Sequence, residues 1–288
     1  MIERANFQGA VFDVDGVLVD SPHEQAWRDA LEQLMETSWR ALRGQTTYSP
    51  ERFTPEIYRA HLSGKPTLSG ARAALHYFGV PEDDARTEEY GRRKQQVMDE
   101  LLDAGELAAY PDALCFVLAV RDAGIPAAAA SSSKNAAGLL SQIRLDAFAE
   151  QEAVHFDFIR PGLTLLDTFD ADVSGRDFPR GKPDPDIFLT AARELGVPAD
   201  QCFAVEDSVA GVQAGKAAGM AVVGLARAGE ADLLTAADAD LVVTTLDEVD
   251  LSAFSAAVWR RRRGSTRAAT GRRPESQRAR IAARSCLS

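Results

Sequence analysis

Short, mostly apolar runs alternate along this chain with longer segments in which apolar residues recur every three or four positions. The short runs are typical of buried strands and cover residues 9–14, 125–131, 172–174, 202–205, 221–225 and 241–243. The periodic segments are typical of helices and cover residues 111–123, 135–144, 184–195 and 209–218. This alternation predicts an α/β fold with a Rossmann-like parallel sheet.

Two stretches do not follow this pattern. Residues 127–130 are consecutive alanines, which favour a helix by propensity alone. Turn signals flank residues 125–131, so we interpret them as a strand. Residues 154–169 are irregular and rich in aromatic side chains, and their pattern assigns them to no element.

The segment from residue 22 to residue 104 contains no convincing strand. Its charged, periodic stretches predict helices at residues 24–35, 55–62, 70–78 and 88–102. We therefore expect a helical module inserted into the α/β core. The expected domains are a core of residues 1–21 plus 105–258, a helical cap of residues 22–104 and an Arg-rich tail of residues 259–288.

Charge is unevenly distributed along the chain. The net charge is −11, yet residues 260–288 contain ten arginines and a single acidic residue, Glu275. Such a tail cannot bury enough apolar surface to fold alone, and we expect it to be disordered. The acidic remainder argues against nucleic-acid binding, although the tail leaves a tether to nucleic acid or an anionic membrane open.

Length and cysteine content set further bounds. A chain of 288 residues is long enough for about two domains. No apolar run approaches the ~20 residues of a membrane span, and the first residues show no signal-peptide pattern. The three cysteines are far apart, which argues against a disulfide framework or a zinc cluster. We expect a cytoplasmic protein, and the sequence does not predict its oligomeric state.

Two carboxylates end the first predicted strand. Side chains alternate along a strand, so Asp13 and Asp15 point to one side and Val14 to the other. Unpaired carboxylates inside a covered sheet are costly, and they are tolerated where a strand runs out into a crevice beside a cation. An acidic turn without a functional role would contain the same residues, so the rest of the sequence must distinguish a ligand-binding site from such a turn.

Three further polar segments are predicted at the carboxyl ends of core strands. They are Ser131-Ser132-Ser133-Lys134-Asn135, Gly181-Lys182-Pro183-Asp184-Pro185 and Val205-Glu206-Asp207-Ser208. With Asp13 and Asp15 they supply carboxylates, hydroxyls, an amide and two lysines, which suits a dianionic phosphate beside a hard cation. Carboxylate and carbonyl oxygens favour Mg²⁺ over zinc or copper.

These segments resemble the motifs of the haloacid dehalogenase-like phosphotransferases, and within them the beta-phosphoglucomutase-like group with a helical cap. The first motif, Asp-x-Asp-Gly, is Asp13-Val14-Asp15-Gly16. The second is Ser131, the third is Lys182 and the fourth is the acidic pair Glu206-Asp207. All four occur in order, and the resemblance covers about residues 8–250.

The resemblance implies a role for each of these residues. Asp13 would be the nucleophile that forms an aspartyl-phosphate, and Asp15 the general acid/base, which requires a raised proton affinity. Ser131 and the backbone N–H of Ser132 would hold the transferring phosphoryl group, and Lys182 would offset its charge. The metal ligands would be Asp13, the Asp15 main-chain carbonyl, Glu206 and Asp207.

The same resemblance leaves hydrolase and mutase open. In the mutases the residues at Lys134 and Asn135 reach a second phosphate. Their hinge histidine falls here on Gln25, however, and their cap signature Gly-x-Ser-Arg is only Gly64-Lys65-Pro66-Thr67. Lys65 or Arg72 could replace the missing arginine. The four histidines (His23, His61, His76 and His155) match no ligand spacing, and we expect surface or packing roles for them.

The leading hypothesis is a Mg²⁺-dependent phosphatase that acts on a small phosphorylated metabolite, such as a sugar phosphate. The alternative enzyme is a beta-phosphoglucomutase-like mutase. A binding module that merely keeps the fold is a third hypothesis, against which the complete motif set argues. A dehalogenase has no use for Asp15 or for a magnesium site.

Overall fold

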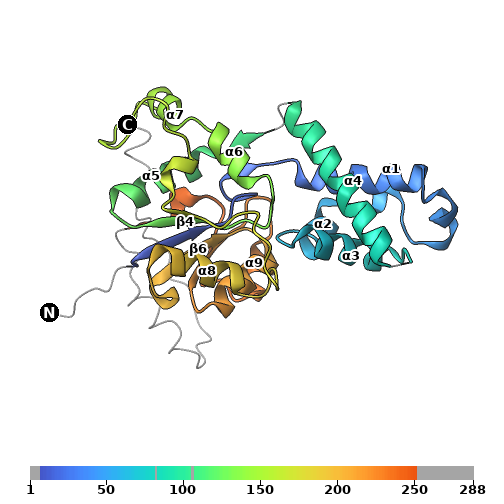
Figure 1. Ribbon diagram of the computed structural model, residues 1–288. Coiled ribbons are helices and arrows are strands. Elements are labelled where there is room, and N and C mark those ends of the chain that lie inside the picture. Colours follow the sequence, from blue (N-terminus) through green and yellow to red (C-terminus); the bar gives the residue numbers. More distant parts are fainter. Residues whose placement is uncertain (1–6, 82, 105–106, 252–288) are drawn as a thin grey trace, which may run out of the picture.

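A six-stranded parallel sheet forms the centre of the computed structural model, which describes residues 7–81, 83–104 and 107–251 (Figure 1). Its strands are β1 (Gly9–Phe12), β4 (Ala127–Ala129), β5 (Ala171–Asp172), β6 (Cys202–Glu206), β7 (Ala221–Leu225) and β8 (Leu241–Val243). They lie in the order β5-β4-β1-β6-β7-β8. The predicted α/β fold class is confirmed.

The strand order reverses at β1, which pairs in parallel with β4 on one side and β6 on the other. In open α/β sheets, ligands bind at the carboxyl ends of the strands where the order reverses. The residues that follow β1, β4 and β6 therefore meet at the favoured binding position of this fold.

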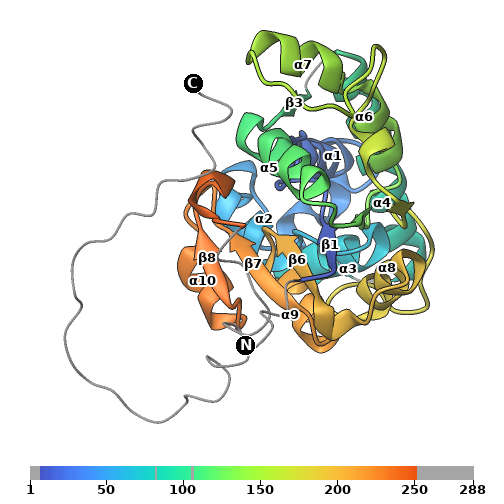
Figure 2. The same ribbon diagram turned by 90° about the vertical axis from the view of Figure 1, so that its left-hand side faces the viewer.

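Helices cover both faces of the sheet (Figure 2). One face carries α5 (Pro111–Asp122), α6 (Ala136–Gln142) and α7 (Leu145–Gln151), and the other carries α8 (Asp186–Leu195), α9 (Val209–Ala217) and α10 (Ala231–Ala236). The alternation within β1 serves both layers, because Phe12 packs into the first and Val11 into the second.

The helical module lies to one side of the sheet (Figure 1). It comprises α1 (His23–Glu36), α2 (Pro55–His61), α3 (Thr67–Phe78), α4 (Asp84–Asp103) and the 3₁₀ helices Arg40–Gln45 and Pro50–Arg52. Aromatic residues such as Trp27, Phe78 and Tyr90 give it a hydrophobic core of its own. Its two linkers pair as a short antiparallel ribbon of β2 (Val19–Asp20) and β3 (Ala108–Ala109).

The structure differs from the expected elements in a few places. The alanine run does form a strand, since all three residues of β4 are buried between neighbouring strands. Helix α4 begins at Asp84, four residues earlier than predicted, because the Asp83 side chain caps its first turn. Short 3₁₀ helices at Leu166–Thr168, Ala199–Gln201 and Leu246–Glu248 were not predicted, and the tail of residues 259–288 lies outside the described residues.

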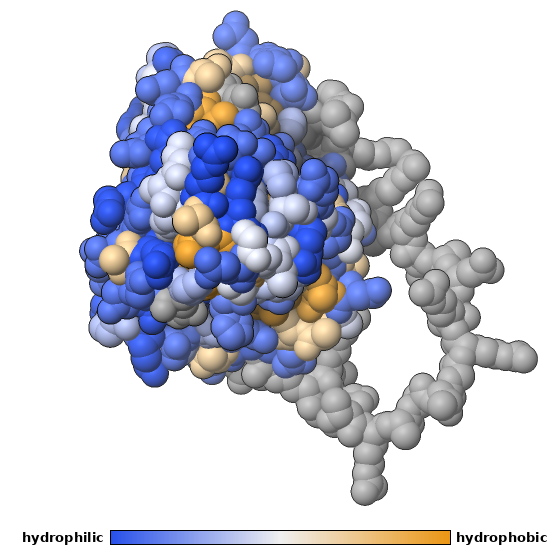
Figure 3. Space-filling model, turned by 90° about the vertical axis from the view of Figure 1, so that its right-hand side faces the viewer, coloured by the Kyte–Doolittle hydropathy of each residue, from blue (hydrophilic) through white to orange (hydrophobic). Residues whose placement is uncertain are grey.

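The surface of the helical module is mainly hydrophilic, with small, separate apolar patches (Figure 3). The large exposed apolar side chains of the described residues are Leu68, Leu189 and Leu233, which lie on three different helices. Within the described part of the chain, no helix combines the length and apolarity needed to cross a membrane.

Candidate active site

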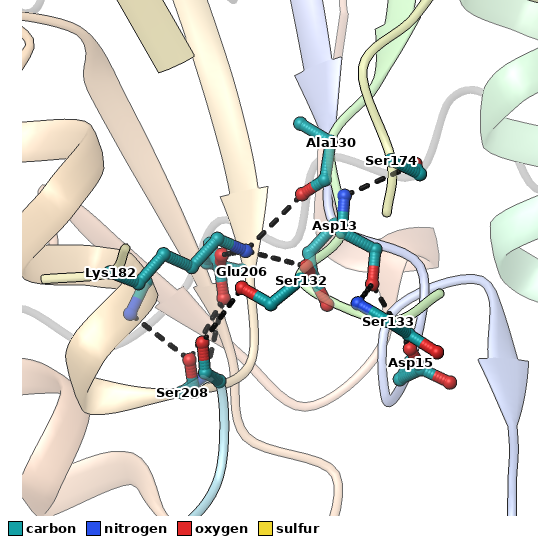
Figure 4. Close-up of polar contacts among 12 residues, drawn as sticks. Asp13, Asp15, Ala130, Ser132, Ser133, Ser174, Lys182, Glu206 and Ser208 are labelled. Atoms are coloured by element: carbon teal, nitrogen blue, oxygen red, sulfur yellow. Dashed lines mark hydrogen bonds and ion pairs between the residues drawn. The ribbon is translucent and has the colours of Figure 1, made fainter. Parts of the chain in front are cut away.

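Asp13 and Lys182 form a buried ion pair at the carboxyl end of β1 (Figure 4). The Lys182 ammonium donates to Asp13 Oδ1 at 2.6 Å, to Glu206 Oε1 at 2.5 Å and to the Ala130 carbonyl at 3.2 Å. Burial disfavours the charged form of Lys182, but the two carboxylates outweigh it and raise its pKa. Lys182 thus joins the ends of β1, β4 and β6.

Three carboxylates gather around this lysine. Asp13, Glu206 and Asp207 each place an oxygen within 4.8 Å of the other two. Burial, opposed by Lys182, raises the pKa of Asp13 to about 8, and burial together with Asp13 raises the pKa of Asp207. One ammonium does not balance three carboxylates, so an all-oxygen cluster of this kind fits a hard divalent cation such as Mg²⁺.

Asp15 lies in a different environment from Asp13. Its carboxylate accepts hydrogen bonds from Ser21 Oγ at 2.6 Å and Ser131 Oγ at 3.1 Å, and it lies 3.1 Å from His23 Nε2. Burial opposes its ionisation, but His23, Ser21 and Lys94 outweigh burial and hold its pKa below the usual range. The expectation of a raised proton affinity at Asp15 is therefore wrong for this arrangement.

His23 is the residue that the sequence interpretation missed. We expected a surface or packing role, yet its ring connects Asp15 to the buried Lys94 of α4, whose Nζ lies 2.7 Å from His23 Nδ1. An ammonium can only donate, so Nδ1 accepts and Nε2 carries the hydrogen given to Asp15. His23 therefore makes the contact that the family pattern would give to Gln25.

Core and cap enclose a cavity of about 210 Å³ over these carboxylates. The core contributes Asp13, Asp15, Ser131 and Asp207. The cap side includes Glu24, Trp27, Tyr58, Arg59, Lys65 and Lys94. Ser132, which also lines it, donates to the Gly64 carbonyl of the cap at 3.3 Å, so the two parts are in contact across the opening.

The two residues predicted to reach a second phosphate are engaged elsewhere. Lys134 lines the cavity but pairs with Asp177 at 2.5 Å. Asn135 does not line the cavity, and its side chain bonds instead with Gln95 and Asp99 of α4. Lys134 and Asn135 thus match the mutase motif in sequence, but their side chains contact other residues of this chain.

The two proposed replacements for the missing cap arginine lie in different places. Lys65 lines the cavity, and its ammonium donates to the His61 carbonyl at 2.5 Å. Burial lowers its pKa, and it makes no ion pair with any other described residue. Arg72 lies on α3, outside this cavity, and pairs with Asp84. Lys65 is therefore the better placed of the two.

Arg227 is a second residue that the sequence analysis did not single out. It donates to the carbonyls of Gly16 and Val17 at 3.3 and 3.2 Å, pairs with Asp112 at 3.0 Å, and stacks on the Tyr110 ring. It thereby ties the loop after Asp15 to the core. Arg227 lies two residues after the end of β7, so a search for polar residues at strand ends could have found it.

Comparison with known proteins agrees with the fold and motifs. The family model for haloacid dehalogenase-like hydrolases matches residues 7–219. A beta-phosphoglucomutase of Mycobacterium bovis is 33% identical, over 84% of this chain and 91% of its own. Hexitol phosphatase A of Escherichia coli is 27% identical, over 85% of this chain and 94% of its own.

A solved structure shares the whole architecture. The beta-phosphoglucomutase of Pyrococcus sp. strain ST 04 has a TM-score of 0.58 and 27% identity, over 85% of this chain and 95% of its own. The motif residues, the parallel sheet and these similarities lead to one assignment. The chain belongs to the haloacid dehalogenase-like hydrolases, a family of enzymes that here includes phosphatases and beta-phosphoglucomutases acting on phosphate esters.

Proposed function

We propose that this enzyme is a Mg²⁺-dependent phosphatase for a small phosphorylated metabolite, with Asp13 as the nucleophile. The observation that carries the proposal is the position of Asp13. It is a buried carboxylate that lines the cavity between core and cap, and it is shared between the Lys182 ammonium and an oxygen cluster fit for a cation. The related hexitol phosphatase supports this substrate class.

The reaction proceeds in two transfers at phosphorus. In the first, an Asp13 oxygen bonds to phosphorus, and the leaving oxygen takes a proton from Asp15. In the second, water attacks phosphorus, Asp15 takes its proton, and the Asp13 carboxylate is restored. Lys182 and Ser131 hold the phosphoryl oxygens. Asp13, the Asp15 carbonyl, Glu206 and Asp207 would hold Mg²⁺, which would supply positive charge to offset that of the phosphate.

Asp15 needs a proton source, because its surroundings hold it ionised. The contacts of His23 supply one. His23 Nε2–H moves its proton to Asp15, and Lys94 donates to Nδ1 of the same ring. Burial lowers the pKa of Lys94 to about 8, so Lys94 can give up a proton near neutral pH. We therefore propose that Lys94 and His23 return a proton to Asp15, the general acid.

Replacing Lys94 by methionine tests this proton path. We expect kcat to fall about 10- to 100-fold. We also expect wild-type kcat to fall as the pH rises through about 8, because Lys94 then loses its proton, and we expect the variant to lack this decrease. The measurement is kcat between pH 6 and 10, with Arg92→Met on the exposed side of α4 as the control. An unchanged kcat with an unchanged alkaline limb contradicts the path.

The contacts around the cavity favour hydrolysis over mutase turnover. A mutase must bind a second phosphate while the first is transferred. Here Lys134 pairs with Asp177, Asn135 is engaged with α4, and Lys94 is engaged with His23. Of the cavity lysines, Lys65 contacts only a backbone carbonyl among the described residues. A mutase remains the second candidate because of the 33% identity to a beta-phosphoglucomutase.

A metabolite panel separates the two. We expect Mg²⁺-dependent release of inorganic phosphate from polyol and sugar monophosphates, and its loss in EDTA. Interconversion of hexose phosphates that depends on added glucose 1,6-bisphosphate, without phosphate release, identifies a mutase instead. Neither activity on the whole panel contradicts the proposed function.

Gly16 provides a test of the cation site. Its φ is +81°, and a Cβ there would lie 2.1 Å from Asp207 Oδ2. We expect Gly16→Ala to displace Asp207, so that half-maximal activity requires about 10- to 100-fold more Mg²⁺. Gly219→Ala is the matched control, because Gly219 has φ +83° but open space around its Cβ position. Equal Mg²⁺ dependence in the two variants contradicts a role of Asp207 in cation binding.

A further inference from the structure

Glu24 is a carboxylate of the catalytic cavity that the reaction does not use. It is the second residue of α1, it is half-buried, and it lines the same cavity as Asp13 and Asp15. It makes no hydrogen bond or ion pair with any other described residue. Burial raises its pKa and outweighs the opposing effect of Arg28 and Arg59.

The other cavity carboxylates nearby are already satisfied. Glu230, on the core side, pairs with Arg59 of α2 at 3.1 Å and accepts the Ala228 N–H at 3.0 Å. Arg59 also lies 3.3 Å from Glu56. Arg59 is therefore engaged by two other carboxylates. Arg28 and Arg59 attract the charge of Glu24 from a longer distance, but neither forms an ion pair with it.

Aromatic side chains line the same cavity as Glu24. Residues three apart share one face of a helix, so Glu24 and Trp27 both reach the cavity from α1. Tyr58 of α2 lines the cavity as well. A cavity lined by both a hydrogen-bond acceptor and aromatic side chains suits a ligand with hydroxyl groups and apolar C–H faces.

We propose that Glu24 is a specificity-determining residue, which accepts hydrogen bonds from hydroxyl groups of the leaving group and disfavours a second anion. This inference rests on the proposed phosphatase function and sharpens it, because it assigns the substrates to monophosphates of polyhydroxylated compounds. Like charges in a partly buried cavity repel strongly, so we expect Glu24 to disfavour bisphosphates.

Two variants and four probes test the proposal. The variants are Glu24→Ala and the nearly isosteric Glu24→Gln, with Glu36→Gln on the exposed part of α1 as the matched control. The substrates are hexitol 6-phosphate, glucosamine 6-phosphate, glucose 1,6-bisphosphate and p-nitrophenyl phosphate, whose leaving group has no hydroxyl groups of its own. The readout is kcat/KM for each pair of variant and substrate.

We expect Glu24→Ala to lower kcat/KM on hexitol 6-phosphate about 10- to 100-fold, the range of a hydrogen bond to a charged group. Activity on p-nitrophenyl phosphate should stay within about twofold, since that leaving group cannot use the contact. Glu24→Gln should improve the bisphosphate relative to the hexitol phosphate. A wild-type preference for glucosamine 6-phosphate over the hexitol phosphate would identify an ammonium as the group bound, and would overturn the hydroxyl assignment.

Two other outcomes also overturn the proposal. One is an equal loss on all substrates, p-nitrophenyl phosphate included, which indicates a structural role for Glu24. The other is a wild-type preference for the bisphosphate, with the second phosphate taken by Lys65. Binding affinities of the same substrates, measured by calorimetry for Asp13→Asn and for Asp13→Asn with Glu24→Gln, test the same specificity in the absence of turnover. If no probe releases phosphate, the proposed function fails, and this result is distinguishable from the outcomes that overturn only the role of Glu24.

Discussion

Asp13→Asn is expected to abolish phosphate release, with kcat lowered about 10⁴-fold or more. The amide cannot attack phosphorus, and it provides a weaker ligand for the cation. The fold should survive, because asparagine matches aspartate in size and Lys182 keeps its contacts with Glu206 and the Ala130 carbonyl. The measurement is steady-state phosphate release, with circular dichroism to check folding.

Asp184→Asn is the matched control for this variant. Asp184 belongs to the third motif, but it is partly exposed and pairs with Arg180 rather than facing the cavity. It should keep turnover within about twofold, as exposed ion pairs contribute little. A protein that keeps its turnover as Asp13→Asn is either not an enzyme of this type or uses another nucleophile.

Lys182→Met is expected to have the second largest effect, on both turnover and stability. The lysine side chain is fully buried between Asp13 and Glu206. Its removal leaves two buried carboxylates without their ammonium, and breaking such a pair costs about 3–5 kcal/mol. We expect kcat to fall about 10³-fold, since a fixed cation at the transferring group is lost.

The two effects of Lys182→Met can be separated. Lys216→Met removes another partly buried lysine, which pairs with Asp240 at 2.6 Å away from the cavity, and should cost stability with little change in kcat. Added Mg²⁺ should restore part of the thermal stability of Lys182→Met but not its turnover. Loss of stability with unchanged kcat would place Lys182 in a structural role alone.

The core of the fold could be predicted from the sequence because its signals are local. The alternation of strands and helices defines the parallel sheet, and the turn residues that flank the alanine run outweigh its helical propensity. The sequence also predicted that Asp13, Ser131 and the pair Glu206-Asp207 lie together, because the carboxyl ends of parallel strands meet at one edge of the sheet.

The surroundings of Asp15 could not be predicted, because they depend on the packing of the cap. His23 begins α1 and Lys94 lies on α4, and these helices pack along each other. No spacing in the sequence shows that Lys94 is buried against His23. Without these two groups, an aspartate beside the Asp13 carboxylate would be expected to hold its proton, which is why the predicted pKa direction was wrong.

Contacts rather than motif residues favour the proposed phosphatase over a mutase. Lys134 and Asn135 match the mutase pattern in sequence, but Asp177 and α4 occupy them. Ion pairs with a partner this exposed are weak, so a substrate with a second phosphate could still compete for Lys134. The choice between water and a sugar hydroxyl as acceptor therefore depends on the cap, where Glu24 and Lys65 face the cavity.

Trapping of the phosphoenzyme tests the central claim most directly. Enzyme with Mg²⁺ and excess hexitol 6-phosphate is quenched in acid within one turnover, digested, and analysed by mass spectrometry. We predict one phosphoryl group on the peptide that contains Asp13, absent in EDTA and in Asp13→Asn. Phosphate release without a phosphorylated Asp13 peptide, or a phosphoryl group on His23 instead, would contradict the account.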